Sequence, residues 1–297
     1  MAKGYSAEEI REKLISILSG SSTGMSGVEI SEKMKINRIT MSKYLKVFAA
    51  DGLVRQKNIG NTNLWFLEPG QESFEFPDDY FKITNLFQEF LQKGSETEIQ
   101  SLIKNSIHSG GETKRLILEV FLPAIELVKN QFDSGKIGFA EQNLLRNIIF
   151  KSLQIFNQHN IVPDSKKNVV LIAADYDSHL ICDSAATIFN SNGWRVSNLG
   201  DMSSAINLLF DLDFQKLLSK IWKQKPGILI VVVFSQTTEG LNFFTDSINP
   251  LKEKFGKQMK VILSGKSLKK TKTNCDLFSE KLDDIIQWSE TTFENSN

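Results

Sequence analysis

Residues 168–183 read NVVLIAADYDSHLICD, and this stretch decides the fold of the C-terminal part of the chain. The run from Val169 to Ala174 is continuously apolar and rich in β-branched residues, which is typical of a strand buried on both faces. Similar runs at 228–234 and 259–263, and a weaker one at 194–199, indicate three further strands. The weaker run is expected nearer the edge of the sheet.

Helical periodicity intervenes between these strands, at about 180–192, 203–224, 240–255 and 279–290. Strands that alternate with helices in this way form a parallel sheet covered on both faces. The sequence therefore predicts a doubly wound, Rossmann-like α/β domain over residues 166–292.

The first 70 residues have a different pattern, with three helices followed by two strands. Ser6 is placed to cap the first helix, and the third helix is expected from Arg38 to Asp51. Strand-like stretches follow at 53–55 and 63–67. This order is that of a winged helix-turn-helix, and the passage SKYLKVFAADGLV at 42–54 resembles the recognition-helix-to-wing segment of the ArsR and MarR families.

Positive charge is concentrated where that third helix is expected. From Glu32 to Gly60 basic residues outnumber acidic ones by about five, although the whole chain has 35 of each. A solvated helix face or a protein–protein module gives the same charge pattern. The exposed face of a helix in the major groove must offer donors to phosphates and base edges. We predict that double-stranded operator DNA is contacted by Asn37, Arg38, Thr40, Ser42, Lys43, Lys46, Arg55 and Lys57.

Residues 78–160 form a third segment, which is helical throughout. Apolar residues at helical spacing mark four helices, and Pro123 inside the third predicts a kink. The connections are short and carry glycine, which predicts antiparallel neighbours and hence a four-helix bundle. The stretch 69–79, with two prolines, a glycine and four acidic groups, is interpreted as the linker before it. The chain is thus expected to be multidomain.

Composition and motif content argue against several classes of protein. The two cysteines, Cys182 and Cys275, form neither a disulfide framework nor a CxxC metal site and fit a reducing compartment. The first residues lack the apolar core of a signal peptide, and no apolar run is long enough to span a bilayer, so we expect a soluble cytoplasmic protein. The sequence contains no GxGxxG after the first strand, and no Walker, Gly-x-Ser-x-Gly or HExxH motif, so we expect no enzymatic activity.

His179 is the residue best placed to meet a ligand. Ligands of open parallel sheets bind beyond the carboxyl ends of the strands, and His179 follows the first strand closely. Asp177 can accept a hydrogen bond from one imidazole nitrogen and leave the other nitrogen free for a metal. A lone histidine is more often a satisfied structural group, and position alone leaves both interpretations open.

The residues around His179 resemble a motif of cobalamin-binding domains. Asp177-x-His179 is similar to Asp-x-His-x-x-Gly, and the resemblance implies that the histidine is the lower axial ligand to cobalt. The passage 192–200 resembles the family's Gly-aromatic-x-Val and Leu-Gly segment, and 122–137 resembles the helical cap over the corrin. The order of domains is similar to that of CarH/LitR-type regulators, light sensors that use adenosylcobalamin and whose oligomeric state sets operator affinity.

This resemblance implies a cobalamin held between the helical bundle and the Rossmann-like domain, with His179 on the metal. The sequence departs from the family pattern where Cys182 replaces the motif glycine, where one glycine, Gly265, replaces a pair, and where the cap signature Trp-x9-Glu-His begins with Phe132 and ends in Gln142-Asn143. The implied cofactor-binding residues are Asp177, His179, Cys182, Gly200, Ser235, Thr237, Gly265, Phe132, Gln142 and Asn143.

The leading interpretation is a transcriptional regulator in which a corrinoid changes oligomeric state or DNA affinity. Haem is an alternative ligand, and a regulator of the same fold that has lost the cofactor is a second alternative. A corrinoid methyl-carrier protein is a third, against which the basic reading helix argues. Because dimeric winged helices bind symmetric DNA sites, a homodimer or tetramer is expected.

Overall fold

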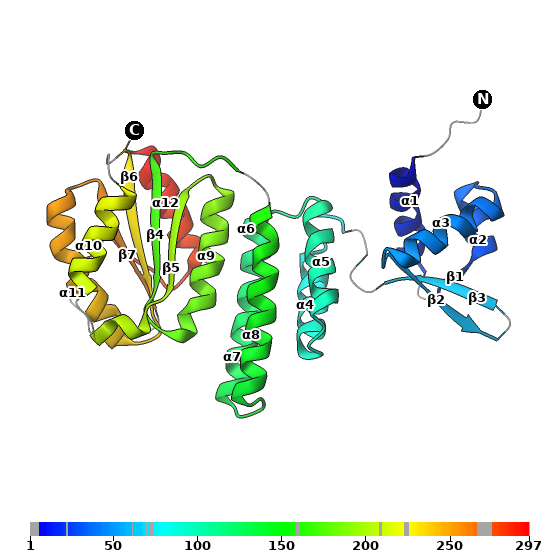
Figure 1. Ribbon diagram of the computed structural model, residues 1–297, viewed down its shortest axis with the longest axis horizontal. Coiled ribbons are helices and arrows are strands. Elements are labelled where there is room, and N and C mark those ends of the chain that lie inside the picture. Colours follow the sequence, from blue (N-terminus) through cyan, green and yellow to red (C-terminus); the bar gives the residue numbers. More distant parts are fainter. Residues whose placement is uncertain are drawn as a thin grey trace. The chain divides into compact units, whose positions relative to one another are not determined.

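The computed structural model describes residues 6–21, 23–60, 62–68, 71, 74–158, 161–207, 210–222, 226–265 and 275–296. The chain divides into two compact units, Met1–Gly111 and Glu112–Asn297, which are described separately below (Figure 1). This division falls inside the segment 78–160, and the predicted domain boundaries stay predictions. Among the described residues, no helix combines the length and the apolar character needed to cross a bilayer.

The first unit begins with three helices and a three-stranded antiparallel sheet of order β1-β3-β2. The helices are α1 (Ala7–Ser19), α2 (Gly27–Met34) and α3 (Arg38–Ala50). The strands are β1 (Met25–Ser26), β2 (Val54–Ile59) and β3 (Thr62–Leu67). The order of three helices and a β-hairpin is as expected, whereas the two-residue β1 was not predicted. One apolar core joins these elements, with Leu14, Ile30 and Met41 fully buried in it.

Local sequence explains where these helices begin. The Ser6 hydroxyl accepts a hydrogen bond from the backbone N–H of Glu9, and the Glu9 carboxylate accepts one from the N–H of Ser6. Ser26 and Glu29 repeat this reciprocal capping box at α2. The predicted cap at Ser6 is therefore confirmed.

Helices α4 (Tyr80–Gln92) and α5 (Glu96–His108) also belong to the first unit and pack against each other. The second unit opens with α6 (Thr113–Leu116), the π-helical turn η1 (Ile117–Phe121) and α7 (Leu122–Asp133), and α8 (Phe139–Leu153) packs against α7. The sequence predicts a kink at Pro123, because proline lacks the N–H that a helical hydrogen bond needs. In the structure the wide π-helical turn η1 ends two residues before Pro123. Four helical stretches are present as predicted, two in each unit, and their packing into one bundle stays a prediction.

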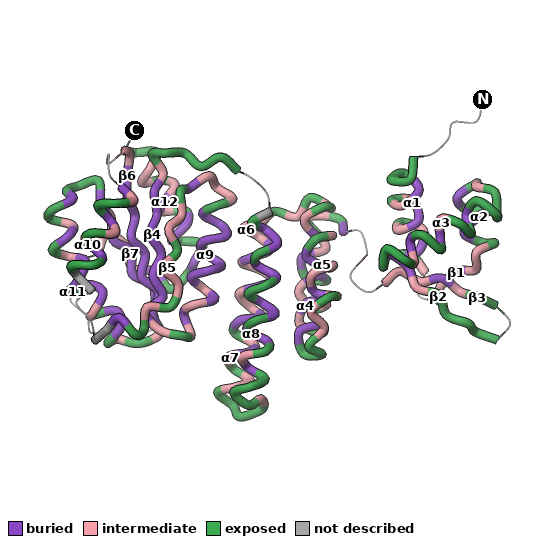
Figure 2. The backbone as a smooth tube through the Cα atoms, in the orientation of Figure 1, coloured by how far each residue is buried: buried purple, intermediate pink, exposed green. Residues whose placement is uncertain are grey.

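The second unit continues into a five-stranded parallel sheet of order β5-β4-β6-β7-β8. Strands β4, β6 and β7 are almost wholly buried, whereas β5 at the edge is partly exposed, as Figure 2 shows. The edge position of β5 is as predicted; the short β8 was not predicted. The strands are β4 (Lys167–Ala173), β5 (Arg195–Asp201), β6 (Ile228–Phe234), β7 (Met259–Ser264) and β8 (Leu277–Phe278).

Helices cover both faces of this sheet (Figure 1). One face packs on α10 (Phe210–Ile221) and α11 (Thr238–Phe255), and the other on α9 (His179–Ser191) and α12 (Leu282–Glu294). Three short 3-10 helices complete the unit, η2 (Gln154–Gln158), η3 (Tyr176–Ser178) and η4 (Ser203–Asn207). Because the strand order reverses between β4 and β6, a crevice for ligands is expected at the carboxyl ends of these two strands.

Candidate ligand-binding site at the carboxyl ends of β4 and β6

Asp175 joins the loops that follow β4 and β6. One of its carboxylate oxygens accepts hydrogen bonds from the Ser235 hydroxyl and the Gln236 N–H, both at 2.7 Å. The other accepts one from the Ser178 N–H at 2.9 Å. Asp175 therefore organises the loops at this edge, and it is not among the residues predicted from the sequence. Its place directly after a buried strand is the signal that identifies it.

Ser235, Thr237 and Gly265, which the family resemblance implies as cofactor-binding residues, lie together at this edge. A Cβ on Gly265 would lie 2.1 Å from the carbonyl oxygen of Ser235, so only glycine fits there. The Thr237 hydroxyl caps α11 by accepting a hydrogen bond from the N–H of Gly240 at 3.2 Å. Packing within the protein accounts for these three residues without a ligand.

His179 begins α9, and one third of its side chain is exposed (33%). Its Nε2 atom lies 3.4 Å from Oδ2 of Asp183, one helical turn later, and its ring stacks on Phe150 of α8. Gly200 is also adjacent, because a Cβ there would lie 3.5 Å from Nε2 of His179. The expected pairing of His179 with Asp177 is not found. Asp177 precedes the helix and forms an ion pair with Lys129 of α7.

A polar cluster lies next to His179, in which Cys182 and Asp183 are buried and Asn198 is exposed. Asn198 donates a hydrogen bond to Oδ1 of Asp183 at 2.7 Å, and the Cys182 thiol donates one to Oδ1 of Asn198 at 3.3 Å. Burial raises the pKa of Asp183, and the charge of His179 opposes this effect. Burial also raises the pKa of Cys182 well above its ordinary value, so the thiol stays protonated. The fully buried Cys182 side chain fills the position of the motif's glycine.

One face of α8 covers the loop between β4 and α9. Asn143 accepts a hydrogen bond from the Tyr176 hydroxyl. Arg146 donates one to the Tyr176 carbonyl oxygen at 2.6 Å, and its guanidinium lies 4.1 Å from the centre of the Tyr176 ring. Of the predicted cap residues, Asn143 thus reaches this loop, whereas Gln142 is buried, Phe132 is half-buried, and neither lines the cavity described next.

A cavity of about 190 Å³ lies between α7, α8 and the carboxyl ends of β6 and β7. Its apolar wall includes Leu122 and Ile125, and its charged groups include Lys129, Arg146 and Asp177. His179 is not among its lining residues. The cavity is therefore separate from the imidazole that the sequence singled out.

His179 is a candidate donor to the cobalt of a corrinoid, but the cavity described above is small for such a ligand. His179 offers an accessible imidazole at the expected edge, yet pockets for ordinary small-molecule ligands already occupy about 300–1,000 Å³, and a corrinoid is larger than most of these ligands. The cavity of about 190 Å³ described above is smaller than this, so α7 and α8 would have to move away from the sheet for a corrinoid to enter it. Among the described residues, no three His, Cys, Asp or Glu side chains form a site for a bare metal ion.

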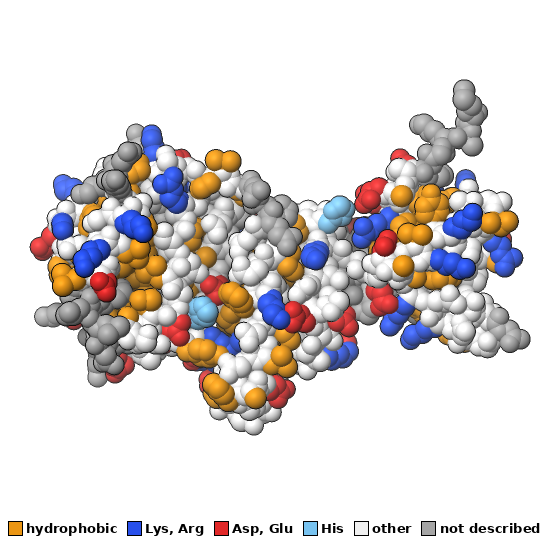
Figure 3. All heavy atoms as spheres, viewed as in Figure 1, with side chains coloured by type: hydrophobic (Ala, Val, Ile, Leu, Met, Phe, Trp, Pro, Cys, Tyr) orange, Lys and Arg blue, Asp and Glu red, His pale blue; other side chains and the backbone are white. Residues whose placement is uncertain are grey.

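The predicted DNA-contacting residues lie on the surface of the first unit. All are exposed except Arg55, which is half-buried and whose Nε atom lacks a hydrogen-bond partner. Figure 3 shows Lys and Arg side chains gathered over α2 and α3. Asn37 also caps α3, since its side chain accepts a hydrogen bond from the N–H of Ile39 at 2.9 Å. Ile39 is 71% exposed and lies off the buried stripe of α3, and it is not among the contacts predicted from the sequence.

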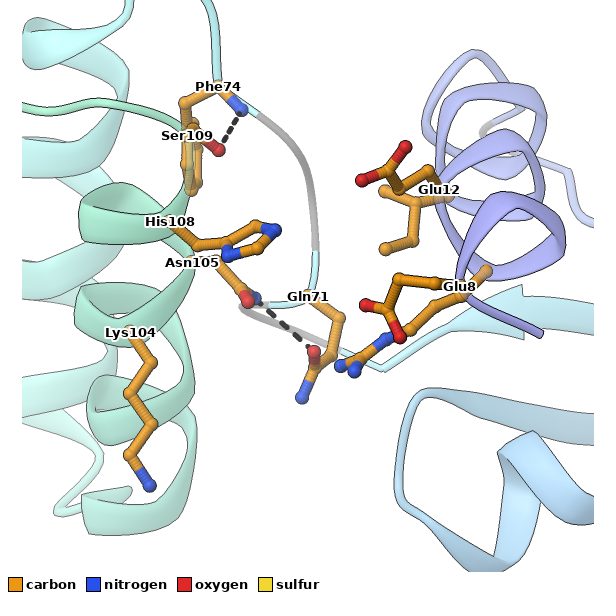
Figure 4. Close-up of a pocket in the computed structure, with 10 residues that line it drawn as sticks. Glu8, Glu12, Gln71, Phe74, Lys104, Asn105, His108 and Ser109 are labelled. Atoms are coloured by element: carbon orange, nitrogen blue, oxygen red, sulfur yellow. Dashed lines mark hydrogen bonds between the residues drawn. The ribbon is translucent and has the colours of Figure 1, made fainter. Parts of the chain in front are cut away.

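A second cavity, of about 530 Å³, lies within the first unit between α1 and α5 (Figure 4). Glu8 and Glu12 of α1 line one side, and Asn105 and His108 of α5 line the other. The segment that precedes α4 is fastened to α5, because Asn105 donates a hydrogen bond to Gln71 at 3.3 Å and Ser109 accepts one from the Phe74 N–H at 3.2 Å. None of the predicted site residues lines this cavity.

No protein-family model matches the sequence, and no curated protein matches it. Among solved structures, the chain is similar to the monomethylamine corrinoid protein of Methanosarcina barkeri, with a TM-score of 0.51 and 14% identity over 72% of this chain and 98% of that one. It is also similar to the methanol:cobalamin methyltransferase complex MtaBC of the same organism, at 16% identity over 76% of this chain and 84% of that one. The TM-score of 0.36 is too low to establish a shared fold. At 14% identity, the first likeness establishes a shared fold of helices followed by a parallel-sheet α/β domain.

Proposed function

We propose that this protein is a DNA-binding transcriptional regulator whose second unit responds to a ligand. The observation that carries the proposal is the exposed face of α3, where Arg38, Lys43 and Lys46 are accessible to solvent. Three helices followed by a β-hairpin match the layout of a winged helix-turn-helix, in which one helix enters the major groove. Lys57 is also exposed, on β2 of the hairpin. The order of elements and the charge of the first unit both support DNA binding.

Selection from random-sequence duplexes, followed by gel-shift titration at several salt concentrations, tests this proposal. We expect a preferred sequence, and Lys43→Ala should weaken binding and lower the salt slope by about one unit, because one phosphate contact is lost. Lys216→Ala on α10 makes the same charge change outside the reader and is the control. Equal slopes for the two variants would contradict the role of α3.

We propose a corrinoid as the ligand of the second unit. The shared fold and the position of His179 at the carboxyl edge of β4 support this, whereas the buried Cys182 and the small cavity oppose it. A bound corrinoid would supply a cobalt centre, and His179 is the residue that would hold it. The Lys129–Asp177 ion pair and the Tyr176–Asn143 hydrogen bond would break as α7 and α8 withdraw.

Coupling of this kind needs little energy. A ligand alters DNA affinity only through its different affinity for the two arrangements, and about 1–3 kcal/mol makes a useful switch. Movement of α7 and α8 is the rearrangement through which the ligand would act. Sedimentation of the protein with and without ligand then shows whether a homodimer or tetramer forms or dissociates.

Absorption spectra of the full chain, recorded in light and dark after addition of hydroxocobalamin or adenosylcobalamin, test the ligand. We expect retained corrin bands that are lost in His179→Ala. A protein that binds DNA but stays colourless is the regulator that has lost its cofactor, and a Soret band after incubation with haem identifies the haem alternative. Bound corrinoid without any DNA binding would favour a corrinoid carrier, the class to which the structural neighbour belongs.

A further inference from the structure

The cavity between α7 and the carboxyl ends of β6 and β7 has the chemistry of a small-molecule site. Leu122 and Ile125 of α7 form an apolar wall, and Leu282 at the start of α12 extends it. Charged groups of both signs line the remainder. Apolar walls with a few convergent polar groups are typical of ligand sites.

Arg146 places a positive charge at this cavity. Arg146 is 6% exposed, and among the described residues its guanidinium contacts the Tyr176 carbonyl oxygen and the Tyr176 ring. It acts on Asp183 through space, but no described carboxylate forms an ion pair with it. A buried charge is costly unless it is paired, and a guanidinium binds a carboxylate through two parallel hydrogen bonds. The cavity thus offers a prepared place for a carboxylate.

Two exposed acidic side chains also line this cavity. Glu126 of α7 and Glu280 before α12 are both exposed, and neither forms an ion pair with a described residue. Lys129 and Asp177 neutralise each other. Once that pair is set aside, a buried cation and two accessible carboxylates remain.

We propose that this cavity binds a small aliphatic α-amino acid. Its carboxylate pairs with Arg146, its ammonium group lies near Glu126 and Glu280, and its side chain contacts Leu122 and Ile125. A volume of about 190 Å³ equals that of about six water molecules, which suits an amino acid better than a nucleotide. The inference goes beyond the proposed function, because it names a ligand for a cavity that the imidazole of His179 does not line.

Calorimetric titration and thermal unfolding of the full chain, with each standard L-amino acid at millimolar concentration, test the inference. We expect one or more of leucine, isoleucine and valine to bind with one-to-one stoichiometry. The matching 2-oxo acid, which lacks the ammonium group, and the matching amine, which lacks the carboxylate, should both fail to bind. Absence of binding by every amino acid would overturn the proposal.

Substitutions of the lining residues test whether the amino acid binds in this cavity. Glu126→Gln and Glu280→Gln should each raise Kd about tenfold, the effect of losing one charge-assisted contact, and Arg146→Gln should abolish binding. Glu141→Gln, an exposed change on α8 outside the cavity, is the matched control. Should Arg146→Gln fail to fold by circular dichroism, the exposed glutamates decide. Unchanged Kd in both glutamate variants would place the ligand elsewhere and overturn the proposal.

The regulator proposal is tested separately on the same preparation. Amino-acid binding by a protein that binds no DNA overturns the regulator and leaves this inference standing. DNA binding without amino-acid binding overturns this inference alone.

Discussion

The hydroxyl of Tyr176 donates a hydrogen bond to the side chain of Asn143, 33 positions earlier in the chain. This contact joins α8 to the loop between β4 and α9, at the edge of the sheet where a ligand is expected. The cap residue that the sequence assigned to a cofactor is therefore engaged by the protein itself. In this arrangement α8 is closed over the loop, and the rate at which the two separate can be measured.

Tyr176→Phe should loosen this closure. The substitution removes the hydroxyl but keeps the ring beneath Arg146. Because one hydrogen bond contributes about 0.5–1.5 kcal/mol net, the opening equilibrium should rise about two- to tenfold. Hydrogen exchange of the segment 176–181, followed by mass spectrometry, measures this. Tyr44→Phe in the first unit is the control, and equal exchange rates in all three proteins would show that the contact does not restrain the loop.

Cys182→Gly should admit a corrinoid more readily at a cost in stability. Glycine inside α9 costs about 1 kcal/mol relative to alanine, and the buried thiol is lost as well. We expect a lower Tm and a stronger corrin spectrum with hydroxocobalamin. Cys182→Ala removes the thiol but keeps a Cβ and separates the effect of space from that of the backbone. A spectrum no stronger than that of the natural protein would mean that Cys182 is not the obstacle.

Asp183 should make stability depend on pH. Its pKa is raised above the ordinary value of 3.8 by burial, so the folded state binds the proton more tightly than the unfolded state. This contribution is complete below about pH 4 and is lost as the pH rises through the raised pKa. Asp183→Asn should therefore flatten the fall of Tm with rising pH above that point. Asp213→Asn, on the exposed side of α10, should leave the profile unchanged.

Ile39→Ala should weaken specific DNA binding without destabilising the fold. Ile39 is 71% exposed in the first turn of α3, where an apolar side chain is suited to contact a thymine methyl group. We expect a loss of about 1–3 kcal/mol on the selected sequence and unchanged affinity for non-specific DNA. Val47→Ala, an exposed change near the other end of α3, is the comparison. Equal losses on both kinds of DNA would argue against base contact by Ile39.

The sequence predicted the sheet well because its signal is local. Val169 to Ala174 and Ile228 to Phe234 are continuously apolar, and a strand buried on both faces requires that pattern. The strands β1 and β8 were missed because each has only two residues and owes its pairing to a neighbouring strand. Periodicity over so short a span carries no signal.

The candidate site was predicted less completely, because its contacts join distant segments. The sequence placed His179 close after the first strand of the sheet, and the structure agrees. The sequence did not indicate that Asp177 would form an ion pair with Lys129, 48 positions away, or that Asp183 would lie beside the imidazole of His179. Partner choice among charged residues depends on how α7 lies over the loop, and spacing along the chain does not encode that geometry.

Helix α9 is covered on both sides, because it contacts β4, β5 and β6 as well as α6, α7 and α8. Nine of its 13 residues are buried, from Leu180 to Phe189. A fragment cut at about residue 166 would expose an apolar helix to water and would tend to aggregate. We therefore expect the helices before the sheet and the sheet itself to unfold in one transition, which calorimetry of the second unit should record as a single peak.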